Sequence, residues 1–311
     1  MMTIIYNNIK HRFITILTLA CIVAISITNL YACKEPPKFQ KEVFDNYTQY
    51  TNAQYGEDAE RQILDLCIPN NKTGRVGLIL MIHGGGWTAG NKDGYLSSLV
   101  DWASNKGYVS AAINYRYASS SVHYADIIDD ISSSLVKIKE ISAEHNILLE
   151  KMLLTGGSAG GHLSLLYGYS QKDTAPITPA AIVSLCGPTD LTDINYYNNT
   201  KYQKELLKMI NPLVGKQITI NNYTQHTETL LNASPISYIT ATSIPTVICH
   251  GQLDDLVPYS NAITLKNKLD EFGVTNHLVP FPNSGHELGY DPDSTARMNE
   301  LMLEYANLYL N

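Results

Sequence analysis

The apolar residues of this chain gather in short continuous runs that are separated by longer stretches with helical spacing. Runs of four to eight apolar residues are typical of strands buried on both faces, as in a parallel sheet. They lie at 76–83, 109–113, 151–155, 180–185, 246–249 and 277–281. The pattern therefore predicts a series of six buried strands.

Between these runs, apolar residues recur every three or four positions. Residues 125–144 show this most clearly, since their isoleucines and leucine fall on one helical face, and residues 262–272 repeat the pattern. Alternating strands and helices predict one doubly wound α/β domain. Residues 190–232 are rich in Asn and Tyr and only weakly periodic, so we expect them to form an insertion over one end of the sheet.

The first 33 residues have the pattern of an export signal. A basic segment at 10–12 precedes an apolar run at 13–32, and Cys33 follows. The end of this run resembles a bacterial lipobox, which would place a lipid on Cys33, although Tyr31 stands where a smaller residue is usual. We expect a signal peptide of the lipoprotein type at 1–32; a plain cleaved signal and a retained anchor are the alternatives.

Each of these three alternatives implies that the protein is exported. We expect a membrane-tethered lipoprotein that faces the periplasm or the cell surface, and otherwise a secreted protein. The polar stretch at 33–55, which opens with Glu35-Pro36-Pro37, predicts a tether. The folded domain is therefore expected at 56–311.

Composition and charge narrow the choice of partner. The chain is 44% hydrophobic and 16% charged, which is typical of a folded globular protein. Its net charge of −7 comes from 22 basic and 29 acidic residues, and it has no long basic run. We therefore expect no nucleic-acid partner, and membrane contact only through the N-terminal lipid or signal anchor.

Three cysteines follow the signal, namely Cys67, Cys186 and Cys249. None belongs to a CxxC pair, so the spacing predicts neither a metal nor a redox site. We expect three buried thiols. A disulfide that includes Cys67 stays open as an alternative, because the compartment is expected to be oxidising.

A G-x-S-x-G sequence, Gly156-Gly157-Ser158-Ala159-Gly160, follows the predicted strand at 151–155 and precedes an apolar helical stretch at 161–169. Glycines allow the sharp, strained turn that projects a serine hydroxyl from the carboxyl edge of a sheet. The N–H groups of the helix behind it favour negative charge. The pattern predicts Ser158 as a nucleophile, against the alternative of a glycine turn with an incidental serine.

A second glycine loop, His83-Gly84-Gly85-Gly86-Trp87, ends the first strong strand. Backbone N–H groups of such a loop can stabilise the oxyanion of an acyl-transfer intermediate, and the N–H of Ala159 would supply another donor. The alternative is a phosphate-binding loop, but neither G-x-x-x-x-G-K-[ST] nor G-x-G-x-x-G occurs here. We expect His83 to bond the loop backbone rather than to act in catalysis.

Two later loops supply a carboxylate and a base. Asp254 and His286 each follow a predicted strand, and the order Ser, Asp, His is the one that hydrolases with this elbow use. A serine hydroxyl is a weak nucleophile until a base takes its proton, and the base needs a carboxylate to fix its tautomer. Asp255 competes with Asp254 for that role, and we favour Asp254.

Two other histidines compete with His286. His162 lies four residues after Ser158 on the same predicted helix, so we expect it to point away from the substrate. His250 is expected to brace its own loop. His286-Glu287 does not continue into H-E-x-x-H, so a zinc protease is not supported.

Together these segments resemble the α/β-hydrolase superfamily, near its hormone-sensitive-lipase-like and acetyl/feruloyl xylan esterase (BD-FAE-like) branch. The resemblance covers residues 60 to 305 and implies one domain with an eight-stranded, mostly parallel sheet, helices on both faces and a serine esterase mechanism. It assigns the oxyanion donors to Gly85 and Gly86, with Gly84 as an alternative, beside Ala159. The motifs that carry it are HGGGW (83–87), NYR (114–116), GGSAGGHLS (156–164), GPTDL (187–191), SPISY (234–238) and HGQLDDLVP (250–258).

The resulting hypothesis is a serine carboxylesterase with the triad Ser158, Asp254 and His286. It needs no metal and no cofactor. We expect short-acyl or hydroxycinnamoyl esters as substrates, including esters on plant cell-wall polysaccharide. The alternatives are an arylformamidase or another amide hydrolase of the same fold and, with less support, a non-catalytic surface binding protein.

Overall fold

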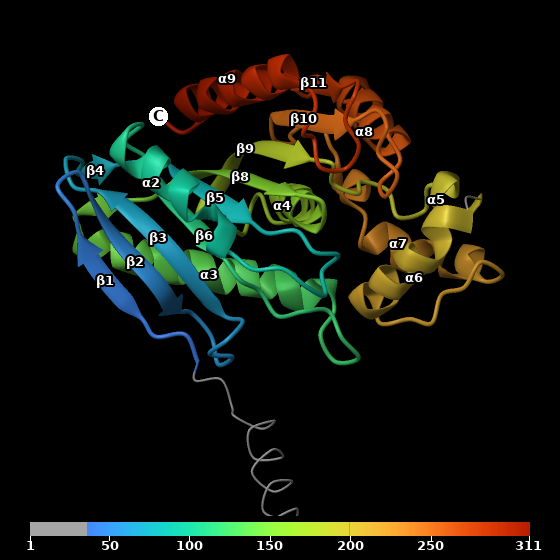
Figure 1. The fold of residues 1–311 in the computed structure, drawn as a ribbon, viewed down its shortest axis with the longest axis horizontal. Coiled ribbons are helices and arrows are strands. Elements are labelled where there is room, and N and C mark those ends of the chain that lie inside the picture. Colours follow the sequence, from blue (N-terminus) through green and yellow to red (C-terminus); the bar gives the residue numbers. More distant parts are fainter. Residues whose placement is uncertain (1–35, 199) are drawn as a thin grey trace, which may run out of the picture. The chain divides into compact units, whose positions relative to one another are not determined.

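A nine-stranded sheet runs through residues 36–198 and 200–311, the part of the chain that the computed structural model describes (Figure 1). Its strand order is β1-β2-β3-β6-β5-β8-β9-β10-β11. The neighbours from β6 to β11 pair in parallel, whereas β1, β2 and β3 are antiparallel to their neighbours. The strands are β1 (Gln40–Val43), β2 (Tyr47–Gln54), β3 (Ile63–Pro69), β5 (Leu78–Ile82), β6 (Val109–Ile113), β8 (Lys151–Gly157), β9 (Thr178–Leu185), β10 (Thr246–Gly251) and β11 (Asn276–Phe281). All six predicted strands are present, and a separate parallel pair joins β4 (Gly74–Arg75) to β7 (Ile147–Leu148).

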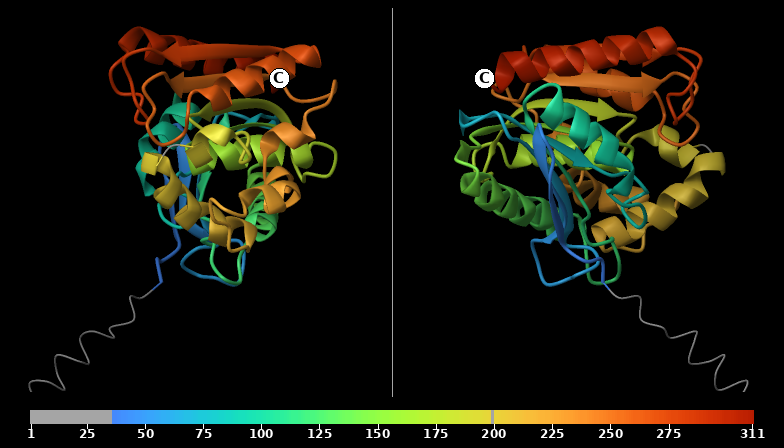
Figure 2. Two further views of the ribbon diagram at one scale, coloured as in Figure 1. Left: turned by 90° about the vertical axis from the view of Figure 1, so that its right-hand side faces the viewer. Right: turned by 60° about the vertical axis from the view of Figure 1, so that its left-hand side comes forward.

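Helices cover both faces of the sheet (Figures 1 and 2). Because side chains alternate along a strand, Leu78 and Leu80 of β5 pack on one face and Ile79 and Met81 on the other. The first face carries α3 (Tyr124–Glu144), α4 (Ala159–Ser170) and α8 (Ser260–Glu271), and the second carries α2 (Leu96–Ser104) and α9 (Pro292–Tyr309). The predicted α/β domain with a mostly parallel sheet is confirmed.

The N-terminal part of the fold differs from the expectation in two ways. The sheet has nine strands rather than eight, because residues 40–43 add an antiparallel edge strand to β2. Residues 40–54 are therefore not a tether but two strands of the sheet, Gln40–Val43 and Tyr47–Gln54, joined by a short turn. Thr48, Tyr50 and Ala53 of β2 are buried, and the register of the strand is irregular between Tyr50 and Ala53. Because these side chains are polar or small, the sequence pattern did not indicate a half-buried strand here.

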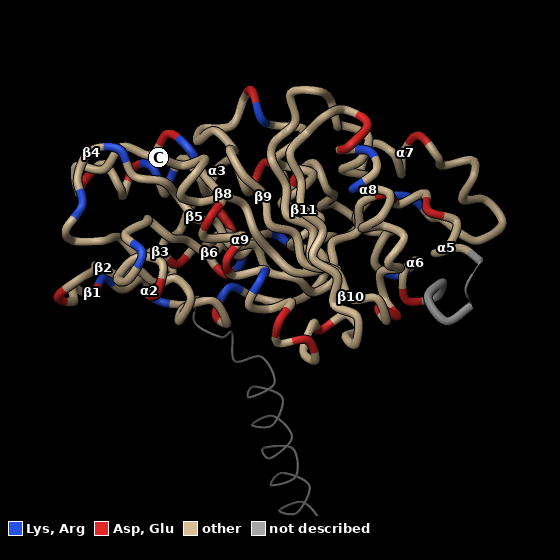
Figure 3. The backbone as a smooth tube through the Cα atoms, turned by 90° about the horizontal axis from the view of Figure 1, so that it is seen from above, with Lys and Arg blue, Asp and Glu red and all other residues tan. Residues whose placement is uncertain are grey.

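Contacts divide the chain into Met1–Pro37 and Lys38–Asn311, and the second unit contains every element named above. The predicted signal peptide at 1–32 and the predicted lipidation site at Cys33 lie outside the described residues. Among the residues that are described, no helix is long and apolar enough to cross a membrane. Acidic and basic residues are interspersed along the described chain (Figure 3).

The insertion expected at 190–232 is helical and lies beyond the carboxyl ends of the parallel strands (Figure 1). It contains α5 (Ile194–Asn198), α6 (Thr200–Val214) and α7 (Thr227–Asn232). Tyr196 and Tyr197 are fully buried, and the Tyr197 ring stacks on that of Tyr223 at 4.1 Å between centroids. These tyrosines pack into the same hydrophobic core as the sheet and its helices, and so they join the insertion to the rest of the domain.

Candidate active site

The turn between β8 and α4 holds Ser158 in a strained conformation. Its φ of 54° and ψ of −120° lie in a region that residues with side chains rarely adopt. A Cβ atom at Gly160 would lie 2.0 Å from the carbonyl oxygen of Ile82, and one at Gly156 would lie 2.4 Å from the same atom. Glycine is therefore needed on both sides of Ser158, because the end of β5 passes directly beside the turn.

The glycine loop after β5 lies against this turn. A Cβ atom at Gly84 would be 2.8 Å from the carbonyl oxygen of Gly157. Gly85 and Gly86 have φ values of 110° and 57°, which favour glycine. No described residue accepts a hydrogen bond from the amide of either glycine. Ala159 opens α4, so its N–H has no partner within the helix. Three amides are thus free to donate beside Ser158.

Asp254 and His286 are brought together from the loops after β10 and β11. Nδ1 of His286 donates to Oδ2 of Asp254 at 2.8 Å. The other carboxylate oxygen accepts the amides of Leu256 and Val257, both at 2.8 Å, and the Asp254 side chain is completely buried. Asp255, the competing carboxylate, is exposed.

Burial alone would raise the pKa of the Asp254 carboxyl group. Hydrogen bonds from His250 and His286, the positive charge that His286 can carry and the amide of Leu256 lower it, and the net pKa lies well below its ordinary value. Asp254 is therefore ionised at neutral pH. A buried, ionised carboxylate beside an imidazole fixes the ring's tautomer and stabilises its protonated form.

Ser158 and His286 line the same cavity, whose volume is about 530 Å³. None of the described residues forms a hydrogen bond with Oγ of Ser158. Catalytic hydrogen bonds are often long in unliganded structures and shorten when substrate binds. The remaining residues that line the cavity are Gly84, Gly85, Gly86, Gly157, Leu185, Met209, Leu256, Glu287 and Leu288.

The two competing histidines are buried and bonded elsewhere. Nδ1 of His162 accepts the indole N–H of Trp87 at 3.1 Å, and its Nε2 donates to the carbonyl of Ala233 at 2.7 Å. Burial lowers the pKa of His162 to about 4, against the opposing effect of the Ala233 bond. Nε2 of His250 lies 2.9 Å from the carbonyl of Val257 and 3.3 Å from Oδ2 of Asp254. Both therefore hold the loops of the site in place.

His83 likewise supports the glycine loop. Its Nδ1 donates to the carbonyl of Gly84 at 2.7 Å, and its Nε2 accepts from Arg61 at 3.0 Å. Its ring stacks on Tyr115, whose hydroxyl donates to the His83 carbonyl at 3.1 Å. Burial lowers the pKa of His83 to about 4, with the Gly84 bond opposing and the Arg61 charge reinforcing that shift. The ring is thus neutral at pH 7.

Two residues close to the catalytic groups were not assigned to the site from the sequence. Met209 of α6 lines the cavity, and a Cβ atom at Gly86 would lie 2.3 Å from its Sδ. Cys186 follows β9 with a φ of 49°, and its Sγ lies within 4.8 Å of ligand atoms of Asp254 and His286. Its place directly before the GPTDL motif was the one available signal for Cys186; nothing local indicated Met209.

Cys186, Asp254 and His286 are also the described residues that could together hold a metal ion. Burial raises the pKa of the Cys186 thiol well above its ordinary value, and the charge of Asp254 raises it further. This disfavours the thiolate that a metal would require. Like Cys186, Cys67 and Cys249 are buried free thiols, as favoured from the sequence.

Comparison with known proteins places this site in a family. The BD-FAE family model matches residues 64–269. The chain belongs to the BD-FAE family. Within this BD-FAE chain the matched region contains Ser158 and Asp254, whereas His286 lies beyond its end.

Curated relatives of this BD-FAE chain include two proteins of Mycobacterium tuberculosis. The probable carboxylic ester hydrolase LipM is 30% identical over 254 residues, which are 78% of this chain and 56% of LipM. Esterase LipQ is 25% identical over 260 residues, which are 80% of this chain and 59% of LipQ. The chain thus spans between half and two thirds of the length of these relatives.

Among solved structures, a truncated carbohydrate esterase from gut microbiota is similar, with a TM-score of 0.69 and 22% identity. The match covers 86% of this chain and 100% of that one. At this identity the likeness concerns the fold, which is that of an α/β-hydrolase.

Proposed function

We propose that this BD-FAE member hydrolyses carboxylic esters through an acyl-enzyme formed on Ser158. One observation carries the proposal: His286, bonded to buried Asp254, and the strained Ser158 line one cavity, beside amides for which no described residue is an acceptor. The names of the curated relatives, a probable carboxylic ester hydrolase and an esterase, support the same reaction class.

In the proposed mechanism, Nε2 of His286 takes the hydroxyl proton as Oγ of Ser158 attacks the ester carbonyl. The amides of Gly85, Gly86 and Ala159 donate hydrogen bonds to the oxyanion that forms. The protonated His286, stabilised by ionised Asp254, gives its proton to the leaving alcohol. Water, deprotonated by His286, then attacks the acyl-enzyme and releases the acid and the free serine.

The cavity favours small or flat acyl groups. Its walls are largely apolar, with Leu185, Met209, Leu256 and Leu288, and Glu287 adds one carboxylate to its lining. A volume of about 530 Å³ accommodates a short acyl chain or one phenyl ring together with part of the alcohol. We therefore propose acetyl or hydroxycinnamoyl esters, including those on plant polysaccharide, and the solved carbohydrate esterase supports this choice.

A substrate panel tests this function. Purified protein is assayed on p-nitrophenyl esters of two to twelve carbons, methyl ferulate and acetylated xylan, with N-formylkynurenine as the amide comparison. The proposal expects the highest kcat/KM on short p-nitrophenyl esters or on methyl ferulate. Turnover of N-formylkynurenine without turnover of any ester would replace it with the arylformamidase alternative, and no turnover at all would favour a binding protein.

We also propose that the protein is exported and carries a lipid on Cys33, on the basis of the residues at 10–33. The test is expression of the full chain in a bacterium with labelled palmitate. Label should enter the wild-type protein and be absent from Cys33→Ser. Equal labelling of both proteins, or of neither, would contradict lipidation at this cysteine.

A further inference from the structure

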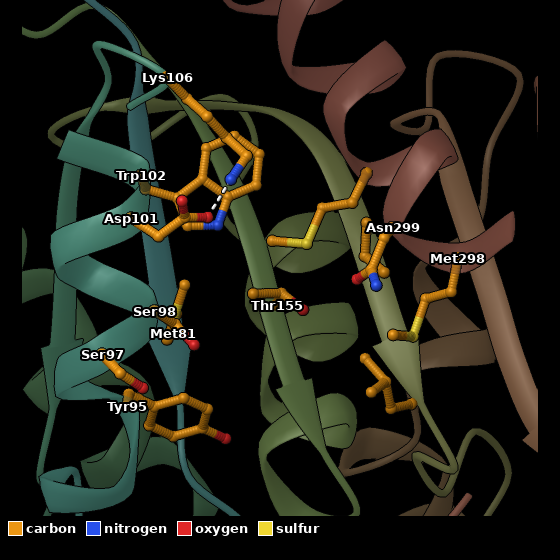
Figure 4. A pocket seen from close by; sticks show the side chains of 13 residues that line it. Met81, Tyr95, Ser97, Ser98, Asp101, Trp102, Lys106, Thr155, Met298 and Asn299 are labelled. Carbon is orange, nitrogen blue, oxygen red and sulfur yellow. Dashed lines mark hydrogen bonds and ion pairs between the residues drawn. The ribbon is translucent and has the colours of Figure 1, made fainter. Parts of the chain in front are cut away.

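A cavity of about 520 Å³ lies between α2 and α9, on the face of the sheet that these helices cover (Figure 4). Its floor is formed by Met81 of β5, Thr155 of β8 and Val183 of β9. Met298 and Met302 of α9 form much of one wall. Methionine side chains are flexible and polarisable, so walls of this kind adapt to small apolar ligands.

Thr155 gives this cavity a polar group that the fold does not use. The residue is only 6% exposed and lies in the middle of the sheet. No described residue forms a hydrogen bond with its Oγ1, and Figure 4 shows its hydroxyl standing on β8 between the α2 and α9 sides. The fully buried side-chain atoms of the described residues that lack a hydrogen-bond partner do not include Oγ1 of Thr155, so this hydroxyl reaches the cavity and can pair with a molecule bound there.

The charges at the edge of the cavity are already neutralised. Lys106 forms an ion pair with Asp101, and its Nζ also lies 4.9 Å from the centroid of the Trp102 ring. The other polar residues that line the cavity, Ser97, Ser98 and Asn299 among them, are uncharged. A charged ligand would therefore lose its hydration without gaining a counter-ion.

We propose that this cavity is a second ligand site, which binds an uncharged small molecule with an aliphatic or aromatic body. A hydroxyl or carbonyl group of that molecule would pair with Oγ1 of Thr155. Leu185 lines this cavity as well as the catalytic one, so the two sites share a wall. The proposal concerns binding alone and does not depend on esterase activity.

The methionines of the chain allow a direct test. In full-length Ser158→Ala protein labelled with ¹³C at the methionine methyl groups, Met81, Met298 and Met302 report on this cavity and Met209 reports on the catalytic one. Met152 is fully buried in the core and serves as an internal control. We expect 4-phenyl-1-butanol to shift the first three methyl signals saturably and to leave Met152 unmoved. Shifts confined to Met209, or none, would overturn the proposal.

Matched variants and ligands test the role of Thr155. Thr155→Val preserves shape and removes the hydroxyl, so it should fold with equal or higher thermal stability and bind the alcohol about five- to tenfold more weakly. Thr178→Val, on an exposed position of β9, should bind like the parent protein. The anion 4-phenylbutyrate and the cation 4-phenylbutylammonium should bind at least about tenfold more weakly than the alcohol. Equal binding by Thr155→Val, or by either ion, would contradict the proposed site.

Discussion

Asp254 and Asp255 are neighbours in the chain but lie in opposite environments. The Asp254 carboxylate is buried and accepts hydrogen bonds from His286 and two backbone amides, whereas Asp255 is exposed. From the order of residues in the sequence, either carboxylate could have oriented His286. The choice between them is made by the loop after β10, which turns one carboxylate inward and the next outward.

This contrast gives a matched pair of variants. Asp254→Asn keeps the shape of the side chain but removes the charge that stabilises protonated His286. We expect kcat on p-nitrophenyl acetate to fall by about a thousandfold or more. Asp255→Asn should stay within about twofold of the wild type. A large loss in Asp255→Asn with little loss in Asp254→Asn would reverse the assignment.

The buried histidines predict how stability depends on pH. The pKa of His162 falls from 6.5 to about 4 on burial, so between these values the unfolded chain binds a proton that the folded chain does not. Stability therefore falls as pH decreases from about 6.5 to about 4, by about 1.4 kcal/mol per pH unit for this residue. The pKa of His83 is likewise lowered by burial from 6.5 to about 4, so His83 also makes stability fall as pH decreases through this range.

Urea unfolding at several pH values measures this slope. In His162→Asn the slope between pH 6 and 4.5 should be smaller than in the wild type by about 1.4 kcal/mol per pH unit. Thr178→Val, at an exposed position of β9, changes no ionisable group; it is the control and should leave the slope unchanged. An unchanged slope in His162→Asn would show that His162 takes up its proton without unfolding.

At the scale of helices and strands, elements with a clear sequence pattern were predicted and those without one were missed. The glycines around Ser158 and the apolar runs of the central strands leave clear local patterns in the sequence, so both were predictable, although the glycines are needed because the distant Ile82 lies beside them. The strand β2 could not be predicted, because its buried residues are Thr, Tyr and Ala within a polar stretch. The place of Met209 in the cavity could not be predicted either, because it depends on how α6 lies over the glycine loop.

The insertion helix α6 should control the size of the acyl group. Met209 lies against Gly86 and narrows the cavity beside Ser158. Met209→Ala should raise kcat/KM for p-nitrophenyl hexanoate relative to the acetate by about three- to tenfold, because a longer apolar chain gains buried surface. Lys208→Ala, whose side chain is 58% exposed on the same helix, should leave the ratio unchanged. A ratio unaffected by Met209→Ala would place the acyl group elsewhere.

At the scale of the whole molecule, the site exists because parallel strands end at one edge of the sheet. The glycine loop follows β5, Ser158 follows β8, Asp254 follows β10 and His286 follows β11. These four segments come from most of the length of the domain, and the sheet alone aligns them. The His286 loop is fixed further by Asp291, which accepts hydrogen bonds from Asn283 and from Ser284 at 2.6 Å.

The central claim is that these strand ends create a serine nucleophile. The most direct measurement is the kcat/KM of purified wild-type protein and of Ser158→Ala on the short ester that the wild type hydrolyses best. Folding of both proteins is checked by thermal unfolding. We predict that Ser158→Ala folds and loses about 10⁴-fold or more of the activity. Equal turnover by the two proteins would contradict the account.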